Sequence, residues 1–570
     1  MKASDYIIEF LISKKITDVF GYPGGVVCHL MDSLYKYRES ISTHTNYHEQ
    51  ASAFAACGYA QASSKCGVAF ATSGPGATNL ITGVCNAYYD SIPVIFITGQ
   101  VDTYAQKGDL KLRQKGFQET DIVSMVKHVT KYSVCVESAE KLQECLETAY
   151  HCATSGRPGP VLLDIPADIQ RAEMQICSGR NFISQDLFGE DDIEKHCDYL
   201  IEAFFKAERP CFLLGSAIKQ SDTSSYIRSL LDKIQVPVVA SMLAFDVLPY
   251  DHPANFGFVG TNGHRYANFI LAKSDLIITL GSRLDLKQVG GQRSAFSPNA
   301  TLIRIDIDQD ELDYKVRNDE VCIRSDIKLL LPKLVEKMPL CENKYEKWLS
   351  TCEVIKQNLQ EKDFKVYHKI IAAISEKVPD DTLITADVGH NQVWVAQSFK
   401  TKRNQSVYFS GGLGSMGYSL PAAIGAFYGK RHPVISINGD GGIQMNIQEL
   451  QFLRREDIPV TVIVINNYAL GMIRHFQEMN FNRLYTQTTS ESGYAAPDFA
   501  AIAKAYGLEY VKVESEGDLT NISFNRVHPS LMEIQLPIDT YLEPKFGNNR
   551  PNQDQEPEID RSLYNYLMNL

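Results

Sequence analysis

Short apolar runs alternate with longer segments of helical character along most of this chain. In the first third, the runs at 67–71 and 94–97 contain only apolar or small residues, and similar runs occur at 211–214 and 460–465. Such alternation is the pattern of parallel sheets covered by helices. It predicts an α/β fold with three mostly parallel sheets, each flanked by helices.

The alternation also predicts where the domains lie. We expect domains at residues 1–180, 192–340 and 360–540, with a polar linker from about 178 to 192. The expected strands are 18–20, 67–71, 94–97 and 160–165, then 211–214, 238–240, 275–280 and 301–305, and finally 433–437 and 460–465. Residues 541–570 are rich in Asn, Gln, Pro and Glu and are predicted to form an extended tail. No short-period repeat is visible, although the first and third domains could be diverged copies of one fold.

Composition excludes several classes of protein. The chain has 570 residues, of which 22% are charged and 44% hydrophobic, as in ordinary globular proteins. A net charge of −12 without a basic stripe argues against a nucleic-acid partner. The amphipathic start does not look like a signal peptide, and no apolar run approaches the roughly 20 residues that cross a bilayer. With thirteen cysteines and no Cys-x-x-Cys pair, we expect reduced thiols in a cytoplasmic enzyme that has no membrane partner.

The clearest chemical signal follows the strand predicted at 433–437. Gly439-Asp440-Gly441 comes directly after that strand, and Asn467 follows the strand at 460–465. Glycine lets the backbone turn tightly against an anion, while Asp440 and Asn467 offer carboxylate and amide oxygens at neighbouring strand ends. Mg²⁺ suits these ligands. Gly-Asp-Gly alone is usually a turn, but its spacing from Asn467 and the strand-helix-strand context match the thiamin diphosphate fingerprint.

Three loops in the first domain carry further signals. A Gly/Pro turn spans 20–25, and Glu49 opens a helix of small residues. Taken alone, Glu49 is more simply a helix-start carboxylate favoured by the helix dipole. The loop at 72–79, however, is rich in glycine and hydroxyl groups and would bring backbone N–H groups close to a ligand.

Six motifs occur together and in order, at 21–25, 48–50, 72–79, 116–119, 411–417 and 439–467. With them the chain resembles the acetohydroxyacid (acetolactate) synthase family of thiamin diphosphate enzymes over about residues 1–540. The resemblance implies a pyrimidine-binding domain, a central FAD-binding-like domain and a pyrophosphate-binding domain. It also implies a homodimer or homotetramer with active sites between subunits, where Glu49 of one subunit meets the metal site of another.

The resemblance implies roles for individual residues. Glu49 matches the glutamate that hydrogen-bonds the aminopyrimidine ring and acts as the acid/base group. Asp440 and Asn467 match the side-chain ligands of Mg²⁺, with the carbonyl of Ala469 as a third ligand. Gly25, Phe117 and Gln118 complete the expected catalytic residues. The expected thiamin diphosphate contacts are Pro23, Thr72, Gly74, Asn79, His390, Asn391, Gly414, Met416, Gly439, Gly441, Gly442 and Met472, with Met416 as the apolar wedge under the cofactor.

The central domain resembles the FAD-binding domain of that family, in which the flavin is structural. The expected flavin contacts are Gly215, Gly260, Thr261, Asn262, Gly281, Arg283, Asp285, Asp306 and Asp326. The alternative is a domain that keeps the fold without the flavin. The sequence leaves this choice open.

Departures from the family pattern concern the second substrate. Phe476 stands where relatives tuned for 2-ketobutyrate carry Trp, Val26 replaces the usual Ala, and the segment 537–544 differs from the usual ending. Lys131 matches a lysine near the substrate funnel, with a solvated surface cation as the alternative. These departures favour a resemblance to flavin-containing branched-sugar synthases of the yersiniose type. Such enzymes move the two-carbon unit of pyruvate onto a CDP-linked keto-deoxysugar for lipopolysaccharide O-antigens.

Other functions stay open beside that hypothesis. An acetolactate synthase that condenses two molecules of pyruvate is the main alternative for the ketone acceptor. A simple decarboxylase typically carries adjacent histidines in its first domain, whereas the nearest pair here is His44 and His48. A non-catalytic homologue would be expected to lack Glu49, Asp440 or Asn467, which are all present. A regulatory subunit is neither indicated nor excluded.

Overall fold

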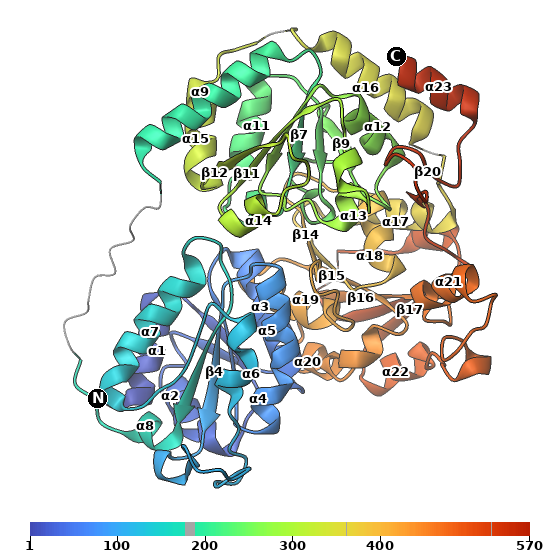
Figure 1. Cartoon of the computed structure of the whole chain (residues 1–570). Coiled ribbons are helices and arrows are strands. Elements are labelled where there is room, and N and C mark those ends of the chain that lie inside the picture. The colour runs from blue at the N-terminus through green and yellow to red at the C-terminus, as the bar shows by residue number, and fades with distance from the viewer. Residues whose placement is uncertain (177–187, 342, 361, 526) are drawn as a thin grey trace.

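The computed structural model describes residues 1–176, 188–341, 343–360, 362–525 and 527–570. It contains three six-stranded sheets, each made of parallel pairs, and one small antiparallel pair. Figure 1 shows the three sheets as separate layers with helices around each of them. The predicted α/β architecture of three helix-flanked sheets is therefore confirmed. The expected boundary at 180 lies outside the described residues, as does most of the expected linker.

The first domain has the strand order β2-β1-β3-β4-β6-β5. Its strands are β1 (Asp18–Gly21), β2 (Ser42–Thr45), β3 (Gly67–Ala71), β4 (Val94–Gln100), β5 (Tyr132–Cys135) and β6 (Val161–Pro166). Its helices are α1 (Ala3–Ser13), α2 (Cys28–Lys36), α3 (Glu49–Ser63), α4 (Pro75–Asn79), α5 (Ile81–Tyr89), α6 (Ile122–Val126), α7 (Ala139–Thr154) and α8 (Ala167–Arg171). The strands β3 and β4 are buried along their whole length, as their apolar sequences predict.

The central domain has the order β12-β11-β10-β7-β8-β9. Its strands are β7 (Pro210–Leu214), β8 (Val238–Ala240), β9 (Asn255–Phe258), β10 (Leu276–Leu280), β11 (Thr301–Asp306) and β12 (Val321–Arg324). Its helices are α9 (Glu190–Lys206), α10 (Ala217–Gln220), α11 (Ser224–Lys233), α12 (Arg265–Lys273), α13 (Leu286–Val289), α14 (Gln309–Asp313), α15 (Ile327–Lys337) and α16 (Glu346–Leu359). The order changes direction between β10 and β7, which is where α/β sheets open onto ligands.

The third domain has the order β14-β13-β15-β16-β18-β17, which repeats the order of the first domain strand for strand. Its strands are β13 (Leu383–Ala386), β14 (Ser406–Phe409), β15 (Val434–Gly439), β16 (Val460–Asn466), β17 (Glu509–Val513) and β18 (Ser530–Gln535). Its helices are α17 (Val366–Lys377), α18 (His390–Ser398), α19 (Ser419–Lys430), α20 (Glu449–Glu456), α21 (Gly471–Asn480) and α22 (Phe499–Ala505). The two domains therefore share one topology, although their sequences show no visible repeat.

The prediction of an extended tail at 541–570 is wrong in part. The segment forms β19 (Lys545–Phe546), β20 (Gln555–Glu556) and the helix α23 (Arg561–Asn569), which lies beside α16 in Figure 1. Asp560 caps α23 by accepting a hydrogen bond from the amide of Leu563, and Leu567 is fully buried in the central core. The polar composition of the tail hid this apolar helix face.

Helix α3 of the first domain packs against α19 of the third domain. Both helices are rich in Ala and Gly, and their backbones meet so closely that a Cβ added at Gly58 would lie 2.1 Å from the carbonyl oxygen of Ala422. The residues of this contact belong to one core shared by both domains. The contact fixes the start of α3, where Glu49 lies, relative to the third domain.

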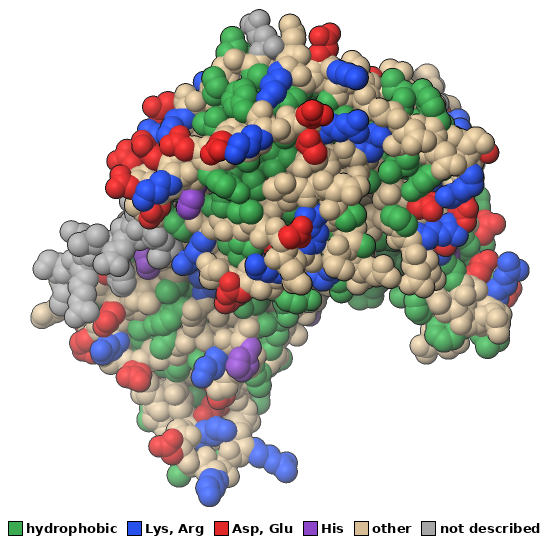
Figure 2. All heavy atoms as spheres, turned by 45° about the horizontal axis from the view of Figure 1, so that its top comes forward, with side chains coloured by type: hydrophobic (Ala, Val, Ile, Leu, Met, Phe, Trp, Pro, Cys, Tyr) green, Lys and Arg blue, Asp and Glu red, His purple; other side chains and the backbone are tan. Residues whose placement is uncertain are grey.

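The face shown in Figure 2 carries both signs of charge, and the described helices include no membrane span. Lys and Arg side chains are interspersed with Asp and Glu over the face shown in Figure 2. Within the described part of the chain, every helix is too short or too polar to cross a membrane.

Candidate active site

The expected metal ligands meet at the end of the third sheet. Strands β15 and β16 pair in parallel, so Asp440 and Asn467 leave the sheet at one edge. The backbone amide of Ala469 donates a hydrogen bond to the carboxylate of Asp440. The structure therefore brings the three residues predicted from the sequence to one place.

Asp440 is suited to a cation. Its side chain is 3% exposed, and the hydroxyl of Tyr494 donates to Oδ2 at 2.8 Å. Burial raises the pKa of Asp440 to about 6, and the hydrogen bond from Tyr494 offsets part of this effect. Among the described residues, Asp440 forms no ion pair with Lys or Arg. A divalent cation would neutralise the carboxylate, and the neighbouring amide and carbonyl oxygens are ligands that Mg²⁺ accepts.

The loop at 411–417 is held against this cluster by Asp387. Asp387 is fully buried after β13 and accepts hydrogen bonds from the amides of Gly417 at 2.9 Å and Tyr418 at 3.2 Å. Burial raises its pKa to about 7. A Cβ added at Gly442 would lie 2.1 Å from Oδ2 of Asp387, so this position requires glycine. Asp387 thereby joins the loop to the Gly-Asp-Gly turn.

Met416 and Gly414 belong to the loop that Asp387 holds. The methyl group of Met416 is 3.5 Å from a Cβ built at Gly441, which places the side chain over the Gly-Asp-Gly turn. Gly414 has a φ of +69°, a conformation that favours glycine. Met416 therefore lies beside the predicted metal ligands, and its role as a wedge stays a prediction.

Two buried polar atoms nearby have no partner among the described residues. They are Nδ1 of His390, at the start of α18, and Oγ of Ser415. Burial lowers the pKa of His390 to about 3, so its ring is neutral at physiological pH. The next residue, Asn391, donates to the carbonyl of Asp387 at 2.7 Å. Unpaired buried polar atoms at a helix start fit the oxygens of a diphosphate.

Glu49 lies in a second cluster, at the start of α3. Its Oε2 accepts a hydrogen bond from Nδ2 of Asn79 at 2.9 Å. Its Oε1 lies 3.2 Å from a Cβ built at Gly76, so the loop at 72–79 passes directly over the carboxylate. Oγ1 of Thr72 is buried there and has no partner in the part of the chain that the structure describes. The loop and the carboxylate predicted from separate motifs therefore form one site.

The turn at 21–25 and the loop around 117 flank Glu49. Gly24 packs against Thr72, and Gly25 begins a short 3-10 helix that includes Val26. Gln118 has a φ of +63° and lies against Gly74. Phe117 is 84% exposed. An apolar ring exposed to that extent beside a polar cluster has no packing role within the chain.

Within the chain, the Glu49 cluster and the Asp440 cluster are separate. Among the described residues, no hydrogen bond or ion pair connects Glu49 with Asp440 or Asn467. Glu49 is bonded to Asn79 of the first domain, whereas Asp440 is bonded to Tyr494 of the third. One chain therefore contains two half sites of complementary chemistry, one with a carboxylate and one with metal ligands.

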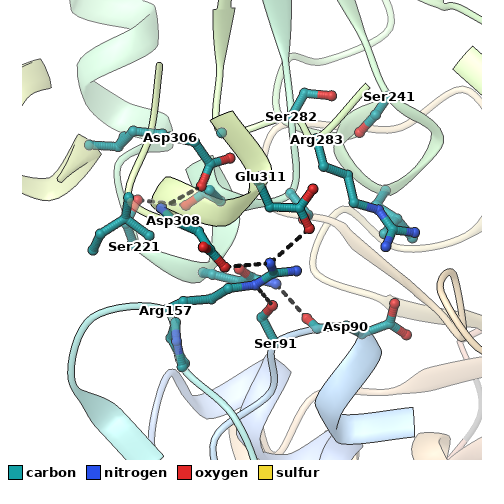
Figure 3. Close-up of a pocket in the computed structure, with 18 of the residues that line it drawn as sticks. Asp90, Ser91, Arg157, Ser221, Ser241, Ser282, Arg283, Asp306, Asp308 and Glu311 are labelled. Carbon is teal, nitrogen blue, oxygen red and sulfur yellow. Dashed lines mark hydrogen bonds and ion pairs between the residues drawn. The ribbon is translucent and has the colours of Figure 1, made fainter. Parts of the chain in front are cut away.

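A cavity of about 1710 Å³ lies where the three domains meet. Figure 3 shows Asp306, Arg283 and Ser282 of the central domain around it, with Asp90 and Arg157 of the first domain opposite. This volume exceeds the roughly 300–1,000 Å³ of ordinary ligand pockets. The cavity is large enough for an extended ligand such as a dinucleotide.

The expected flavin residues gather around this cavity. Of the nine, all except Gly215 and Gly260 line it. The two exceptions pack tightly next to lining residues, because a Cβ at Gly215 would lie 1.9 Å from the carbonyl of Gly281. Asp285 and Asp326 also cap α13 and α15, so both have structural roles in addition. The arrangement fits a flavin dinucleotide in size and in donor groups.

Comparison with known proteins supports the predicted family over most of the chain. Residues 1–125, 197–334 and 387–533 match the N-terminal TPP binding domain, the central domain and the C-terminal TPP binding domain of thiamine pyrophosphate enzymes. The chain is 35% identical to acetolactate synthase isozyme 2 large subunit of Escherichia coli over 518 residues, 89% of this chain and 90% of that one. It is 37% identical to the probable acetolactate synthase large subunit of Methanocaldococcus jannaschii, over 95% and 91%. The acetolactate synthase large subunit of Lactococcus lactis is 34% identical, over 95% and 93%.

The chain belongs to the acetolactate synthase family of thiamin diphosphate enzymes. The family predicted from the ordered motifs is therefore confirmed, and with it the binding of thiamin diphosphate. The protein is an enzyme that depends on this cofactor. Buried polar atoms of His390, Ser415 and Thr72 have no partner in the described part of the chain, which fits a polar ligand at both clusters.

Three further residues of this acetolactate synthase homologue, Lys131, Met472 and Phe476, were predicted to contact the substrate or the cofactor. Nζ of Lys131 donates to the carbonyls of Ser155 and Arg157, each at 2.7 Å, and Lys131 and Met472 line the large cavity. Burial lowers the pKa of Lys131. Phe476 is 53% exposed on α21, one turn after Met472. Their roles toward substrate stay predictions.

Several residues of the family site had no signal in the sequence. Tyr494 donates to Asp440 from 54 residues downstream, and Asp387 organises the 411–417 loop from the end of a short strand. Asp90 joins the first and third domains by accepting the amides of Gly411 at 3.0 Å and Gly412 at 2.7 Å. Such roles arise from tertiary contacts, so spacing along the chain cannot reveal them.

Proposed function

We propose that this protein is an acetolactate synthase, which decarboxylates pyruvate and joins the remaining two-carbon unit to the keto carbon of a second pyruvate. The observation that carries the proposal is the similarity of this chain to proteins named acetolactate synthases. The similarity covers about nine-tenths or more of each chain. The retained Glu49, Asp440 and Asn467 support the same activity. A cytoplasmic location is part of the proposal.

Each group of site residues has a separate role in the proposed reaction. Bound thiamin diphosphate supplies a nucleophilic carbon and an electron sink for decarboxylation. Glu49 serves as the acid/base group toward the aminopyrimidine ring, held in place by Asn79 at 2.9 Å. Asp440, Asn467 and the carbonyl of Ala469 would hold Mg²⁺, which would neutralise charge on a bound diphosphate. Phe117, Gln118 and Gly25 border the space in which water must be excluded from the reacting carbon.

The active site is proposed to form between two copies of the chain in a homodimer or homotetramer. Support comes from the separation of the two half sites within one chain and from the exposed ring of Phe117. In such an assembly the carboxylate of one subunit faces the metal ligands of the other. A regulatory subunit is not part of this proposal.

The acceptor is assigned to pyruvate and not to a nucleotide sugar. The sequence departures at Val26, Phe476 and the tail favour a CDP-linked keto-deoxysugar, but the relatives match the acetolactate reaction better. Single substitutions around a pocket change selectivity by only about 1–3 kcal/mol when they alter apolar volume. They therefore carry less weight than a likeness over the whole chain.

Product analysis tests this assignment. The purified protein is incubated with thiamin diphosphate, Mg²⁺, FAD and pyruvate, with and without a CDP-linked keto-deoxysugar, and the products are identified by mass spectrometry. We expect acetolactate in equal amount in both incubations. A sugar nucleotide heavier by one acetaldehyde unit, formed at the expense of acetolactate, would contradict the assignment and restore the sugar hypothesis.

Phe476→Trp is expected to shift the acceptor preference toward 2-ketobutyrate. A wider aromatic surface on α21 adds apolar contact for the extra methylene of that acceptor, and we expect a shift of about tenfold. The measurement is the ratio of acetohydroxybutyrate to acetolactate in an equimolar competition. Phe481→Trp is the control, because Phe481 is also exposed and lies edge-on at 5.9 Å from Phe476. An equal shift in both variants would remove the special role of Phe476.

FAD is proposed to occupy the cavity between the domains, as a structural group. We expect wild-type protein to quench flavin fluorescence on binding and Arg283→Ala to weaken binding at least about tenfold, since it removes a charge-assisted contact. Arg293→Ala is the control, because Arg293 belongs to the same domain and bonds to the carbonyls of Tyr314 and Lys315. Wild-type protein that does not bind FAD would instead indicate a domain that has lost the flavin.

A further inference from the structure

Glu449 is a buried carboxylate to which the reaction as described assigns no role. It is the first residue of α20 and is 0% exposed. Its Oε1 accepts the backbone amide of Tyr47 at 2.7 Å, and its Oε2 accepts Nδ2 of Asn46 at 2.9 Å. Both donors belong to the segment that connects β2 to α3. The carboxylate thus reaches from the third domain into the residues directly before Glu49.

Two further contacts hold the same segment. Nδ2 of Asn446, just ahead of α20, lies 3.2 Å from Oε1 of Gln50. The guanidinium of Arg455 donates to the carbonyl of Thr45 at 2.8 Å. The segment 45–50 is therefore bonded to the third domain at Thr45, at the two residues that Glu449 contacts, and at Gln50. Glu449 provides the two central bonds of this set.

Burying the carboxylate of Glu449 costs free energy of folding unless its hydrogen bonds offset that cost. Burial raises its pKa to about 7, and the bonds from Asn46 and Tyr47 act in the opposite direction. The described residues provide no direct ion pair for it, and Arg455 acts only through its more distant charge. A buried carboxylate that accepts a backbone amide and a side-chain amide fixes two points of the chain in space.

We propose that Glu449 is a positioning residue for Glu49: it holds the backbone of residues 46–47 so that the first turn of α3 presents the Glu49 carboxylate to the cofactor in one orientation. The inference rests on the acid/base role proposed for Glu49. It adds a link within each chain between the carboxylate half site and the segment that follows the Gly-Asp-Gly turn, because Glu449 and Asp440 belong to one continuous stretch.

The test uses two substitutions of graded severity. Glu449→Gln keeps the shape and one acceptor oxygen, whereas Glu449→Ala removes both acceptors. We expect kcat to fall about 10–100-fold in the alanine variant, because a small displacement of a catalytic group has an effect of that size. KM is expected to change little, and the glutamine variant is expected to lie between wild type and alanine.

The second readout does not need turnover. Amide hydrogen exchange of peptides covering residues 42–52 is measured by mass spectrometry on the protein without cofactor. We expect exchange at Tyr47 and its neighbours to be at least about tenfold faster in both variants, since the amide loses its partner or part of it. Peptides from the first-domain strands β3 and β4 are expected to exchange as in wild type.

Asp164→Asn is the matched control. Asp164 is also a buried carboxylate of raised pKa, about 7, and it accepts two hydrogen bonds, from Thr98 and Gln100. It lies on β6, near the opposite edge of the sheet from β2. We expect this variant to leave exchange at 42–52 unchanged. A comparable acceleration there would show a general loss of stability and overturn the proposal.

The outcomes separate the inference from the proposed function. Unchanged exchange at 42–52 in Glu449→Ala overturns the positioning role, whatever happens to kcat. Faster exchange with wild-type kcat also overturns it, because the held segment would not matter for Glu49. If Glu49→Gln itself keeps full turnover, the proposed role of Glu49 fails instead, and the exchange measurement still shows whether Glu449 holds the segment.

Discussion

Replacing Glu49 by Gln is expected to give a folded protein that retains the cofactor but loses nearly all turnover. The amide keeps the shape of the side chain and the contact with Asn79, but it cannot accept or return a proton. A positioned acid/base group contributes about 10²–10⁴-fold to a rate, and we expect acetolactate formation to fall by that factor. The measurement is initial rate at saturating pyruvate, with cofactor binding determined on the same sample.

The matched control is Glu346→Gln. Glu346 is the first residue of α16, as Glu49 is the first residue of α3, and both are acidic residues in a first helical turn. The substitution therefore tests how much the loss of any carboxylate at a helix start changes turnover. We expect wild-type turnover from this variant. Unchanged pyruvate consumption in Glu49→Gln would contradict the acid/base assignment.

Asp440→Ala is expected to abolish the retention of thiamin diphosphate at physiological Mg²⁺ concentration. Asp440 provides the carboxylate of the predicted metal cluster and is buried. Loss of outer-shell partners alone costs about 10–100-fold in metal affinity, so we expect a larger loss here. Calorimetric titration of cofactor at several Mg²⁺ concentrations measures it. Tyr494→Phe, which removes only the hydrogen bond to Asp440, is expected to have a smaller effect. Binding like that of wild type in Asp440→Ala would contradict the metal site.

Mixing these two inactive variants tests where the site forms. If Glu49 of one subunit works with Asp440 of another, a mixed dimer has one intact site and one doubly altered site. Random exchange of subunits would then restore roughly a quarter of wild-type activity. No recovery after verified exchange would place both residues of each site in a single chain and contradict the proposed assembly.

Most inner strands could be predicted from the sequence, but the inner strands β13 and β18 and the edge strands could not. Strands such as β4 and β16 are buried at every residue, so apolar runs identify them. All six edge strands, β2 among them, lie outside the predicted set. β2 has the polar sequence Ser42–Thr45 and is half exposed. The inner strand β18 was hidden by Glu533, whose charge is accommodated by Asn466 and Tyr510.

Some residues of the candidate site could be predicted from the sequence and others could not. Residues that a ligand contacts carry recognisable chemistry at fixed spacing, and so Glu49, Asp440 and Asn467 were identified from motifs. Residues that hold the ligand-binding loops, such as Asp387 and Glu449, act through contacts made only after folding. Their carboxylates look like ordinary surface charges in the sequence. Burial and partner atoms are what distinguish them.

The identity of the acceptor could not be predicted from sequence motifs alone. The substitution of Phe476 and the unusual ending suggested a larger acceptor, yet the ending folds into a strand pair and a helix docked on the central domain. An unusual tail sequence can therefore reflect packing on α12 and α16 instead of a change in substrate. Likeness over about nine-tenths or more of the chain supports the proposal of pyruvate as the acceptor.

The most direct test of the proposed activity follows the bond that the enzyme forms. Pyruvate labelled with carbon-13 at its keto carbon is supplied as the sole substrate, with thiamin diphosphate and Mg²⁺, and the product is examined by carbon NMR. Acetolactate contains the two labelled carbons bonded to each other, so we expect a pair of mutually coupled signals that is absent without the cofactor. Labelled acetaldehyde with one uncoupled signal, or unreacted pyruvate, would contradict the assignment as an acetolactate synthase.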